Sequence, residues 1–121
     1  MLNPLRDFVA FDLETTGLER DADEIIEIGA VRVRDGKIEE TMSCLLKAEK
    51  PLSTLVESLT GISAAMLAES AIEPREGLEA FLRFAGDLPL VAHNSDFDAT
   101  FVAHALTKLS LPPMANRVYK C

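Results

Sequence analysis

The sequence is poor in positive charge, in cysteine and in long apolar runs. Its 121 residues include 12 Lys and Arg against 20 Asp and Glu, which gives a formal net charge of −8. A broad basic surface that follows many phosphates is therefore excluded, because such a surface needs clustered Lys and Arg. Any nucleic acid would have to be bound locally, at a small site.

The two cysteines, Cys44 and Cys121, form no CxxC motif and no Cys/His cluster. This usage is typical of a reducing, intracellular compartment. The N-terminus has no apolar signal segment, and no apolar run reaches the roughly 18 residues that a transmembrane helix requires. We therefore expect a cytoplasmic protein with no membrane association.

The pattern of apolar residues predicts an α/β domain. With 48% hydrophobic residues the chain can bury a core. The apolar run 8–11 predicts a strand buried on both faces. A second strand over 25–34, an Asp35-Gly36 turn and a return strand from Lys37 to about Leu46 predict an antiparallel meander.

Helices and a further strand follow the meander. We expect two short helices within 51–69, opened by Thr54 and Ser63, and a longer helix over 74–85 that begins at a proline and ends before Gly86. The remaining expected elements are a fourth strand over 88–92, a helix carrying Phe97 to Leu109, and the start of a fifth strand at 117–119. Together these elements predict a mixed sheet with flanking helices.

Asp12 and Glu14 carry the chemistry of the first strand. Side chains alternate along a strand, so the two carboxylates point the same way, about 7 Å apart at ~3.3 Å per residue. Two anions in a poorly hydrated place repel each other, and Mg²⁺ or Mn²⁺ would remove the conflict. The alternative is that Asp-x-Glu is only a solvated loop entry. The turn at Thr15-Thr16-Gly17 places two hydroxyls and several backbone amides beside the carboxylates. This combination suits a phosphate group that is bound on top of the metal ion.

Asp98 is the candidate for a third carboxylate. It follows the fourth strand, and if that strand lies beside the first, Asp98 can face Asp12 and Glu14. The alternative is that Ser95 caps a helix and Asp98 merely serves its first turn. His93 also has two interpretations, a histidine bonded to a neighbouring backbone or a general base, and we favour the first.

With these motifs placed, the chain resembles the DEDD exonuclease superfamily. Residues 11–18 match its first exonuclease motif, and residues 91–98 match its second, with Asp98 as the motif aspartate. Residues 25–31 and 59–63 resemble its intervening segments. The likeness is greatest to the DEDDh branch, which includes the proofreading epsilon subunit of bacterial DNA polymerase III and the PolC exonuclease domain.

The resemblance implies an RNase H-like fold and a metal-dependent 3′-5′ exonuclease that releases nucleoside monophosphates from single-stranded DNA in proofreading or repair. Asp12, Glu14 and Asp98 would be catalytic and would bind two Mg²⁺ or Mn²⁺ ions. The implied partners are a single-stranded 3′ end and a DNA polymerase or another replication or repair protein. The residues implied to contact the terminal nucleotide are Thr15, Thr16, Gly17, Leu18, Asn94 and Phe97.

The third motif of the family, His-x-x-x-x-Asp, is absent. It carries the general base and a fourth carboxylate, and the 23 residues after Asp98 contain no such pair. We expect residues 1–121 to be a single, truncated exonuclease-like domain covering about the first two thirds of a family domain, either as a fragment of a longer exonuclease or as a natural short form that has lost its base. Its activity should be weak or absent, since general-base assistance is worth ~10²–10⁴ in rate. The incomplete sheet should favour self-association.

Two other functions remain open. A 3′ exoribonuclease would use the same residues, because nothing in them separates ribose from deoxyribose. A catalytically silent module that binds a nucleic-acid end or a polymerase-like partner would be consistent with the absent third motif. Release of mononucleotides from a labelled oligonucleotide distinguishes these possibilities.

Overall fold

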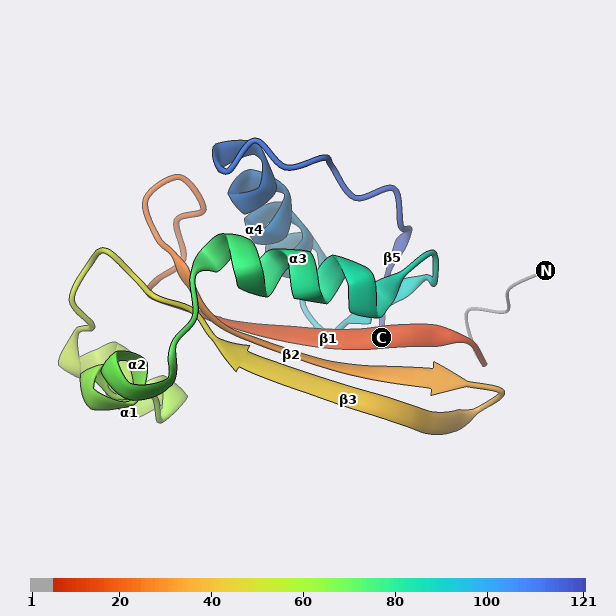
Figure 1. Ribbon diagram of the computed structural model, residues 1–121, viewed down its shortest axis with the longest axis horizontal. Helices are drawn as coiled ribbons and strands as arrows, with labels where there is room; N and C mark the ends of the chain where they lie inside the picture. The colour runs from red at the N-terminus through yellow and green to blue at the C-terminus, as the bar shows by residue number, and fades with distance from the viewer. Residues whose placement is uncertain (1–5) are drawn as a thin grey trace.

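The computed structural model describes residues 6–121 as a five-stranded mixed sheet with helices packed on it (Figure 1). The strand order is β3-β2-β1-β4-β5. The first three strands form an antiparallel meander, and β4 and β5 run parallel to β1. The predicted fold class is therefore confirmed. The strands are β1 (Phe8–Thr15), β2 (Ile25–Arg34), β3 (Lys37–Leu45), β4 (Leu90–Ala92) and β5 (Val118–Lys120).

The turn between β2 and β3 has the conformation that its sequence predicts. Asp35 and Gly36 both have positive φ angles, 53° and 75°. Two consecutive left-handed residues give a turn whose twist matches that of the strands it joins, which is why Asp-Gly favours it. A side-chain oxygen of Asp7 also accepts the Asp35 amide hydrogen at 2.9 Å.

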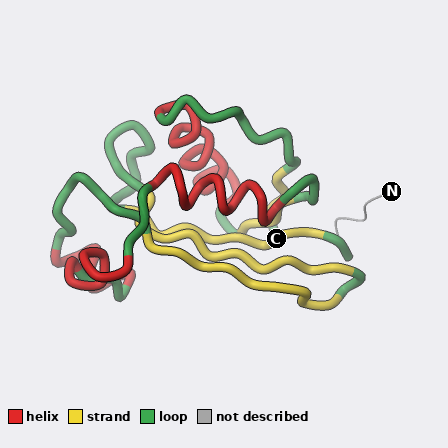
Figure 2. The backbone as a smooth tube through the Cα atoms, viewed as in Figure 1, coloured by secondary structure: helices red, strands yellow, loops and turns green. Residues whose placement is uncertain are grey.

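The two longer helices, α3 (Pro74–Ala85) and α4 (Ser95–Lys108), lie on the same face of the sheet (Figures 1 and 2). Pro74 occupies the first turn of α3 and Gly86 follows its last residue, as predicted. Proline suits a first turn because the amide hydrogen that it lacks would have no partner there.

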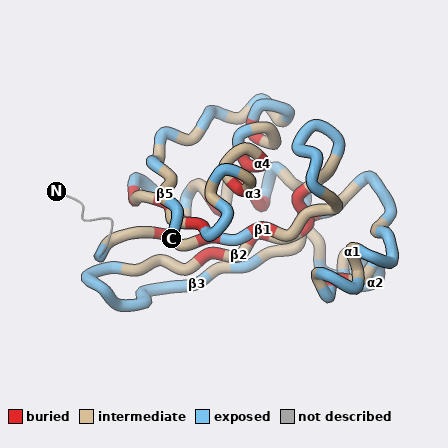
Figure 3. The backbone as a smooth tube through the Cα atoms, turned by 180° about the vertical axis from the view of Figure 1, so that it is seen from behind, coloured by how far each residue is buried: buried red, intermediate tan, exposed pale blue. Residues whose placement is uncertain are grey.

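The short helices α1 (Thr54–Thr60) and α2 (Ala64–Ser70) lie beside one end of the sheet and bury no residue (Figures 1 and 3). α1 begins at Thr54 as predicted, but the residue that caps it is Ser53, whose side chain accepts the Val56 amide hydrogen. A hydroxyl one residue earlier reaches the free amide better. Ser63 caps α2 as predicted.

The core lies between one face of the sheet and the two longer helices (Figure 3). Val9, Phe11 and Leu13 are buried, whereas Ala10 on the other face is half-buried and Asp12 is exposed. The prediction of a first strand buried on both faces is therefore wrong, because among residues 6–121 both longer helices cover the same side. The largest fully buried side chains are Phe81, Ile26, Ile28, Leu46, Leu78, Leu90, Leu106, Val9 and Val102.

The short parallel strands differ slightly from their predicted bounds. The fourth strand begins at Leu90 rather than Leu88, after a proline that has no amide hydrogen to give to a neighbour. β5 begins one residue later than predicted and pairs with β4. β3 and β5 form the two edges of the sheet, so self-association through an edge remains a prediction.

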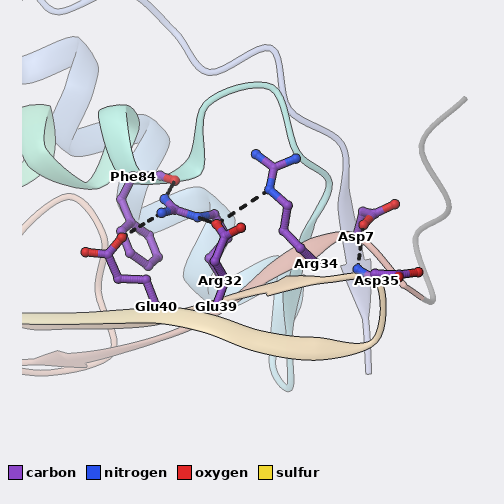
Figure 4. A network of polar contacts seen from close by, with 7 residues as sticks. All are labelled: Asp7, Arg32, Arg34, Asp35, Glu39, Glu40 and Phe84. Atoms are coloured by element: carbon purple, nitrogen blue, oxygen red, sulfur yellow. Dashed lines mark hydrogen bonds and ion pairs between the residues drawn. The ribbon is translucent and has the colours of Figure 1, made fainter.

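Arg32 on β2 ties the hairpin to the end of α3 (Figure 4). Its guanidinium donates to the backbone oxygen of Phe84 at 2.9 Å and lies 4.6 Å from the centre of the Phe84 ring. It also donates to Glu39 at 2.6 Å and to Glu40 at 2.7 Å. The hydrogen bond from Arg32 is the main cause that lowers the pKa of Glu39.

We predict that Arg32→Ala lowers the melting temperature more than Arg34→Ala does. Arg32 joins two strands and a helix through several groups, whereas Arg34 has one exposed ion pair, 3.6 Å from Glu39. Because the Glu39 pKa is lowered in the folded state, the ion-pair part of this stabilisation is present above the ordinary value of 4.5 and is lost as the pH falls. Thermal unfolding followed by circular dichroism measures both effects; equal melting temperatures for the two variants would contradict the first.

Two sequence-based expectations concern membrane-spanning helices and the cysteines. In the part of the chain that the structure describes, no helix is both long and apolar enough to cross a bilayer. Cys44 and Cys121 are both free thiols, half-buried and exposed respectively.

Candidate active site

The candidate site lies where β1 and β4 end side by side. The two strands are parallel, with Val9 opposite Leu90 and Ala10 opposite Val91. Their carboxyl ends therefore lie next to each other at the same end of the sheet, which is the usual place for ligand sites in such folds. This arrangement confirms that the fourth strand lies beside the first. It brings the β1 residues Asp12 and Glu14 toward the N-terminus of α4.

Asp98 is the one buried polar or charged side chain in residues 6–121, with 3% of its surface exposed. The helix-capping explanation for it is wrong in detail. The N-cap of α4 is Asn94 rather than Ser95, and the helix begins without a side-chain cap hydrogen bond. The Asp98 amide donates to the Asn94 carbonyl at 3.0 Å, the ordinary bond of a first helical turn. Its burial therefore needs another reason.

The three carboxylates are close enough to act on one another electrostatically. Burial, followed by the charges of Asp12 and Glu14, raises the pKa of Asp98 to about 6. Burial is also the main cause that raises the pKa of Glu14, followed by the charges of Asp12 and Glu27. Mutual repulsion of this kind is what a divalent cation relieves.

The donor chemistry fits a hard divalent cation, because carboxylate oxygens are the ligands that Mg²⁺ and Mn²⁺ prefer. No ion pair between a Lys or Arg and any of these three carboxylates is found in residues 6–121. Over the same range, no three Asp, Glu, His or Cys side chains already form a group that could hold a metal ion. The shared metal site thus stays a prediction.

Glu27 is a residue of this site that the sequence interpretation missed. The antiparallel register places it directly opposite Glu14 on β1. The register then shifts, so that Thr15 pairs with Ile25, and such an irregularity turns the following residues out of the regular pleat. Pairing the two predicted strands residue by residue would have located Glu27, but the shift itself has no signal in the sequence.

The residues predicted to contact a terminal nucleotide differ in how accessible they are. The Thr15 hydroxyl donates to the Gly17 carbonyl at 2.6 Å and the Thr16 hydroxyl to Asp23 at 3.1 Å, so both protons are used inside the loop. Leu18 is 80% exposed. Beyond β4, Asn94 is exposed, whereas Phe97 is half-buried with its ring 4.7 Å from that of Phe101.

The contacts of the two histidines are with residues other than the three carboxylates. His93 is exposed, and its Nδ1 lies 4.0 Å from the Sγ of Cys121 rather than against a backbone group. The expected hydrogen bond between His93 and a backbone group is not found among residues 6–121. His104 on α4 lies 3.7 Å from a carboxyl oxygen of Asp21 in the β1–β2 loop.

We predict that Asp98→Asn stabilises the metal-free protein above pH 6. The folded-state pKa of Asp98 is raised from 3.8 to about 6, so the folded state binds the extra proton and the ionised carboxyl costs stability at higher pH. The cost grows between pH 3.8 and about 6 and amounts to roughly 1–3 kcal/mol. Urea unfolding in EDTA at pH 8 and pH 4 tests this: the gain should be present at pH 8 and small at pH 4, and equal gains would contradict it.

Comparison with known sequences supplies the deciding observation. The profile of the Exonuclease (RNase_T) family matches residues 9–121, almost the whole chain. The chain belongs to this exonuclease family. The resemblance carried by the motifs at 11–18 and 91–98 is thereby confirmed.

Within the exonuclease family the chain is similar to segments of bacterial polymerases. It is 43% identical over 105 residues to the PolC-type DNA polymerase III of Caldanaerobacter subterraneus subsp. tengcongensis, covering 87% of this chain and 7% of that protein. The PolC-type polymerase of Halalkalibacterium halodurans is 39% identical over 117 residues, covering 95% of this chain and 8% of that protein. The chain thus spans less than a tenth of these relatives.

The fold of this exonuclease-family chain is also found in solved structures. Escherichia coli Exonuclease I in complex with a dT13 oligonucleotide superimposes with a TM-score of 0.83 at 16% identity. The match covers 95% of this chain and 28% of that protein. At this identity the likeness concerns the fold, and it confirms the predicted RNase H-like exonuclease architecture.

Proposed function

We propose that this chain carries a metal-dependent 3′-5′ exonuclease site that removes nucleoside monophosphates from the 3′ ends of single-stranded DNA. The observation that carries the proposal is the buried carboxyl of Asp98, whose pKa is raised by burial and by the charges of Asp12 and Glu14. Holding three anions together without a Lys or Arg partner is unfavourable unless a cation joins them. Membership of the exonuclease family supports a catalytic role for that cation.

Asp12, Glu14 and Asp98 would hold Mg²⁺ or Mn²⁺ in a two-ion site. When bound, such ions activate a water molecule and stabilise the leaving 3′ oxygen. The chain itself positions the nucleic-acid end. Leu18 and Asn94 offer exposed contacts from the two sides of the site, and Phe97 lines the second side. The Thr15-Thr16-Gly17 backbone completes the contact surface for the terminal nucleotide.

Several observations support single-stranded DNA and a polymerase context. The structurally similar Exonuclease I is described with a dT13 oligonucleotide, and the similar sequences are PolC-type DNA polymerase III proteins. The net charge of −8 favours binding of a few nucleotides over binding of a long duplex. We accordingly propose that residues 1–121 form one exonuclease-like domain segment that acts in the cytoplasm beside a polymerase or another replication or repair protein.

The test is hydrolysis and binding of matched oligonucleotides by the 121-residue protein. A 5′-labelled single-stranded DNA should shorten one nucleotide at a time with Mn²⁺ and remain intact in EDTA. Because the chain has no His-x-x-x-x-Asp motif, we expect slow turnover, and binding of the same oligonucleotide by fluorescence anisotropy is measured in parallel. As a control, Asp21→Ala, which changes an exposed aspartate of the β1–β2 loop, should behave like the unsubstituted protein in both assays.

Each outcome selects one function. Shortening of DNA faster than of RNA supports the proposal, whereas the reverse order identifies an exoribonuclease. Metal-dependent binding without any hydrolysis identifies a module that holds a nucleic-acid end. An absence of both binding and hydrolysis overturns the proposal.

A further inference from the structure

We propose that Asp23 is a positioning residue that holds the loop 15–18 in the shape that receives the terminal nucleotide. The inference rests on the proposed function, because it assigns the anchor of the loop which that function uses. Asp23 belongs neither to the three carboxylates of the site nor to the residues predicted to contact the nucleotide.

Both carboxyl oxygens of Asp23 bind the inside of the β1–β2 loop. One accepts the Thr16 hydroxyl hydrogen at 3.1 Å, and the other accepts the Glu19 amide hydrogen at 2.9 Å. The Thr16 hydroxyl oxygen in turn accepts the Glu24 amide hydrogen at 2.9 Å, and the Thr16 amide donates to the Glu24 carbonyl at 2.9 Å. Asp23 therefore links Glu19 to Thr16, and Thr16 is in turn bonded to Glu24 at the other end of the loop.

The charge of Asp23 is used within the loop rather than in an ion pair. The ion pairs of this loop belong to Asp21, which lies 3.9 Å from Arg20 and 3.7 Å from His104. Asp21 is exposed, whereas Asp23 is half-buried. Hydrogen bonds to an ionised acceptor are about twice as strong as neutral ones, which suits Asp23 as an anchor. Asp21 offers a matched control, with the same side chain two residues away.

The Asp23 carboxylate explains why the loop has glycine at position 17. The φ angle of Gly17 is not positive, so its backbone would accept an L-residue. A Cβ atom there would instead collide with the Asp23 carboxylate, at 2.6 Å from Cγ and at similar or closer range to both oxygens. The carboxylate thus lies directly against the Gly17 backbone. The absence of a side chain at Gly17 and the presence of Asp23 are two halves of one packing arrangement.

The position of this anchor relates it to the reaction. The loop begins at Thr15, directly after Glu14 and the register shift of β1. It presents Leu18 at 80% exposure immediately after Gly17. Loss of the Asp23 bonds would release Gly17 to Glu19, while Thr16 keeps its two hydrogen bonds to Glu24 and the strand that carries Asp12 and Glu14 stays paired. Binding of the nucleotide end, rather than of the metal, should therefore suffer.

The experiment compares Asp23→Ala, Asp23→Asn and Asp21→Ala in the 121-residue protein. The measured quantities are the affinity for a 5′-labelled single-stranded DNA in Mn²⁺, the affinity for Mn²⁺ alone, and hydrogen exchange of the Glu19 amide. Asp23→Ala should weaken DNA binding about ten- to a hundredfold, the range expected when hydrogen bonds to a charged group are lost, and should speed exchange at Glu19. Mn²⁺ affinity should stay within about threefold. Asp23→Asn keeps an acceptor for Glu19 and should restore most of the binding, and Asp21→Ala should behave like the native chain.

A double-mutant cycle with Gly17 tests the packing directly. Gly17→Ala should weaken DNA binding in the native background, because the new Cβ displaces the Asp23 carboxylate. In the Asp23→Ala background the same change should add less than about threefold, since the colliding group is gone. Additive losses would overturn the proposed link between the two residues.

The two proposals fail in different ways. If Asp23→Ala binds DNA as tightly as the unsubstituted chain does, the positioning role is overturned and the proposed function still stands. A native chain that binds no DNA in Mn²⁺ overturns the proposed function and this inference with it. A Glu19 amide that exchanges equally fast in the native chain and in Asp23→Ala contradicts the anchor whatever the chain binds.

Discussion

Asp12→Ala should abolish the heat of Mn²⁺ binding to this protein and, with it, metal-dependent release of nucleotides. Asp12 lies on the exposed side of β1 opposite Gly29, and its charge raises the pKa values of both Glu14 and Asp98. Its charge therefore acts on both of the other carboxylates of the trio. If this ligand to the cation is removed, the reaction should lose several kcal/mol of transition-state stabilisation, which corresponds to a rate lower by a factor of about 10³ or more.

The same substitution should leave the fold intact, which makes the result interpretable. Asp12 is exposed, so its removal opens no cavity. Its loss also removes a repulsion from the buried Asp98, and the metal-free protein should melt at or above the native temperature.

Isothermal titration with Mn²⁺, thermal melting in EDTA and oligonucleotide shortening give the three measurements for Asp12→Ala. Asp21→Ala is the control, because it removes an equally exposed aspartate that lies in the neighbouring loop. Native-like Mn²⁺ heat in Asp12→Ala would rule out the proposed metal site.

Phe81→Ala should have the largest effect on stability. Phe81 is completely buried in the middle of α3, and its ring centre lies 5.2 Å from that of Phe11 on β1. Truncation removes the contact that joins helix to sheet and leaves a cavity, at a cost of about 3–5 kcal/mol. Since domains of this size are stable by roughly 5–15 kcal/mol, the variant should be partly unfolded under mild conditions.

Urea unfolding followed by circular dichroism measures this loss. The control is Leu59→Ala, which removes a comparable apolar side chain that is 75% exposed on α1 and should change stability by less than about 0.5 kcal/mol. Similar losses in the two variants would mean that the sheet and α3 do not form the common core described above.

The sequence interpretation succeeded where structure depends on neighbours along the chain. Asp35-Gly36 forms the predicted turn because both residues tolerate positive φ. Its errors are mostly small shifts at element ends, as at Thr54 and Ser95, where adjacent polar residues compete for one cap. Such competition is decided by the path of the chain into the helix.

Contacts between residues that are not neighbours along the chain were harder to predict. The burial of Asp98 depends on α4 packing against the sheet, and Glu27 faces Glu14 because of the strand register. The role of Asp23 depends on a loop that folds its carboxylate onto Gly17. None of these contacts has a local pattern, because each joins residues whose separation is set by the tertiary fold.

By itself the sequence determined the order of strands and helices, the common direction of Asp12 and Glu14, and the resemblance to an exonuclease family. Those features follow from alternation along a strand, from turn residues and from motif spacing, all of which are local. Only the tertiary structure decided that the longer helices cover one face of the sheet and that Asp98 is buried near two other anions. It also decided that the Asp23 carboxylate binds Thr16 and Glu19 inside the loop. The physical reason is that burial, pKa shifts and loop anchoring arise from through-space contacts, which the fold as a whole creates.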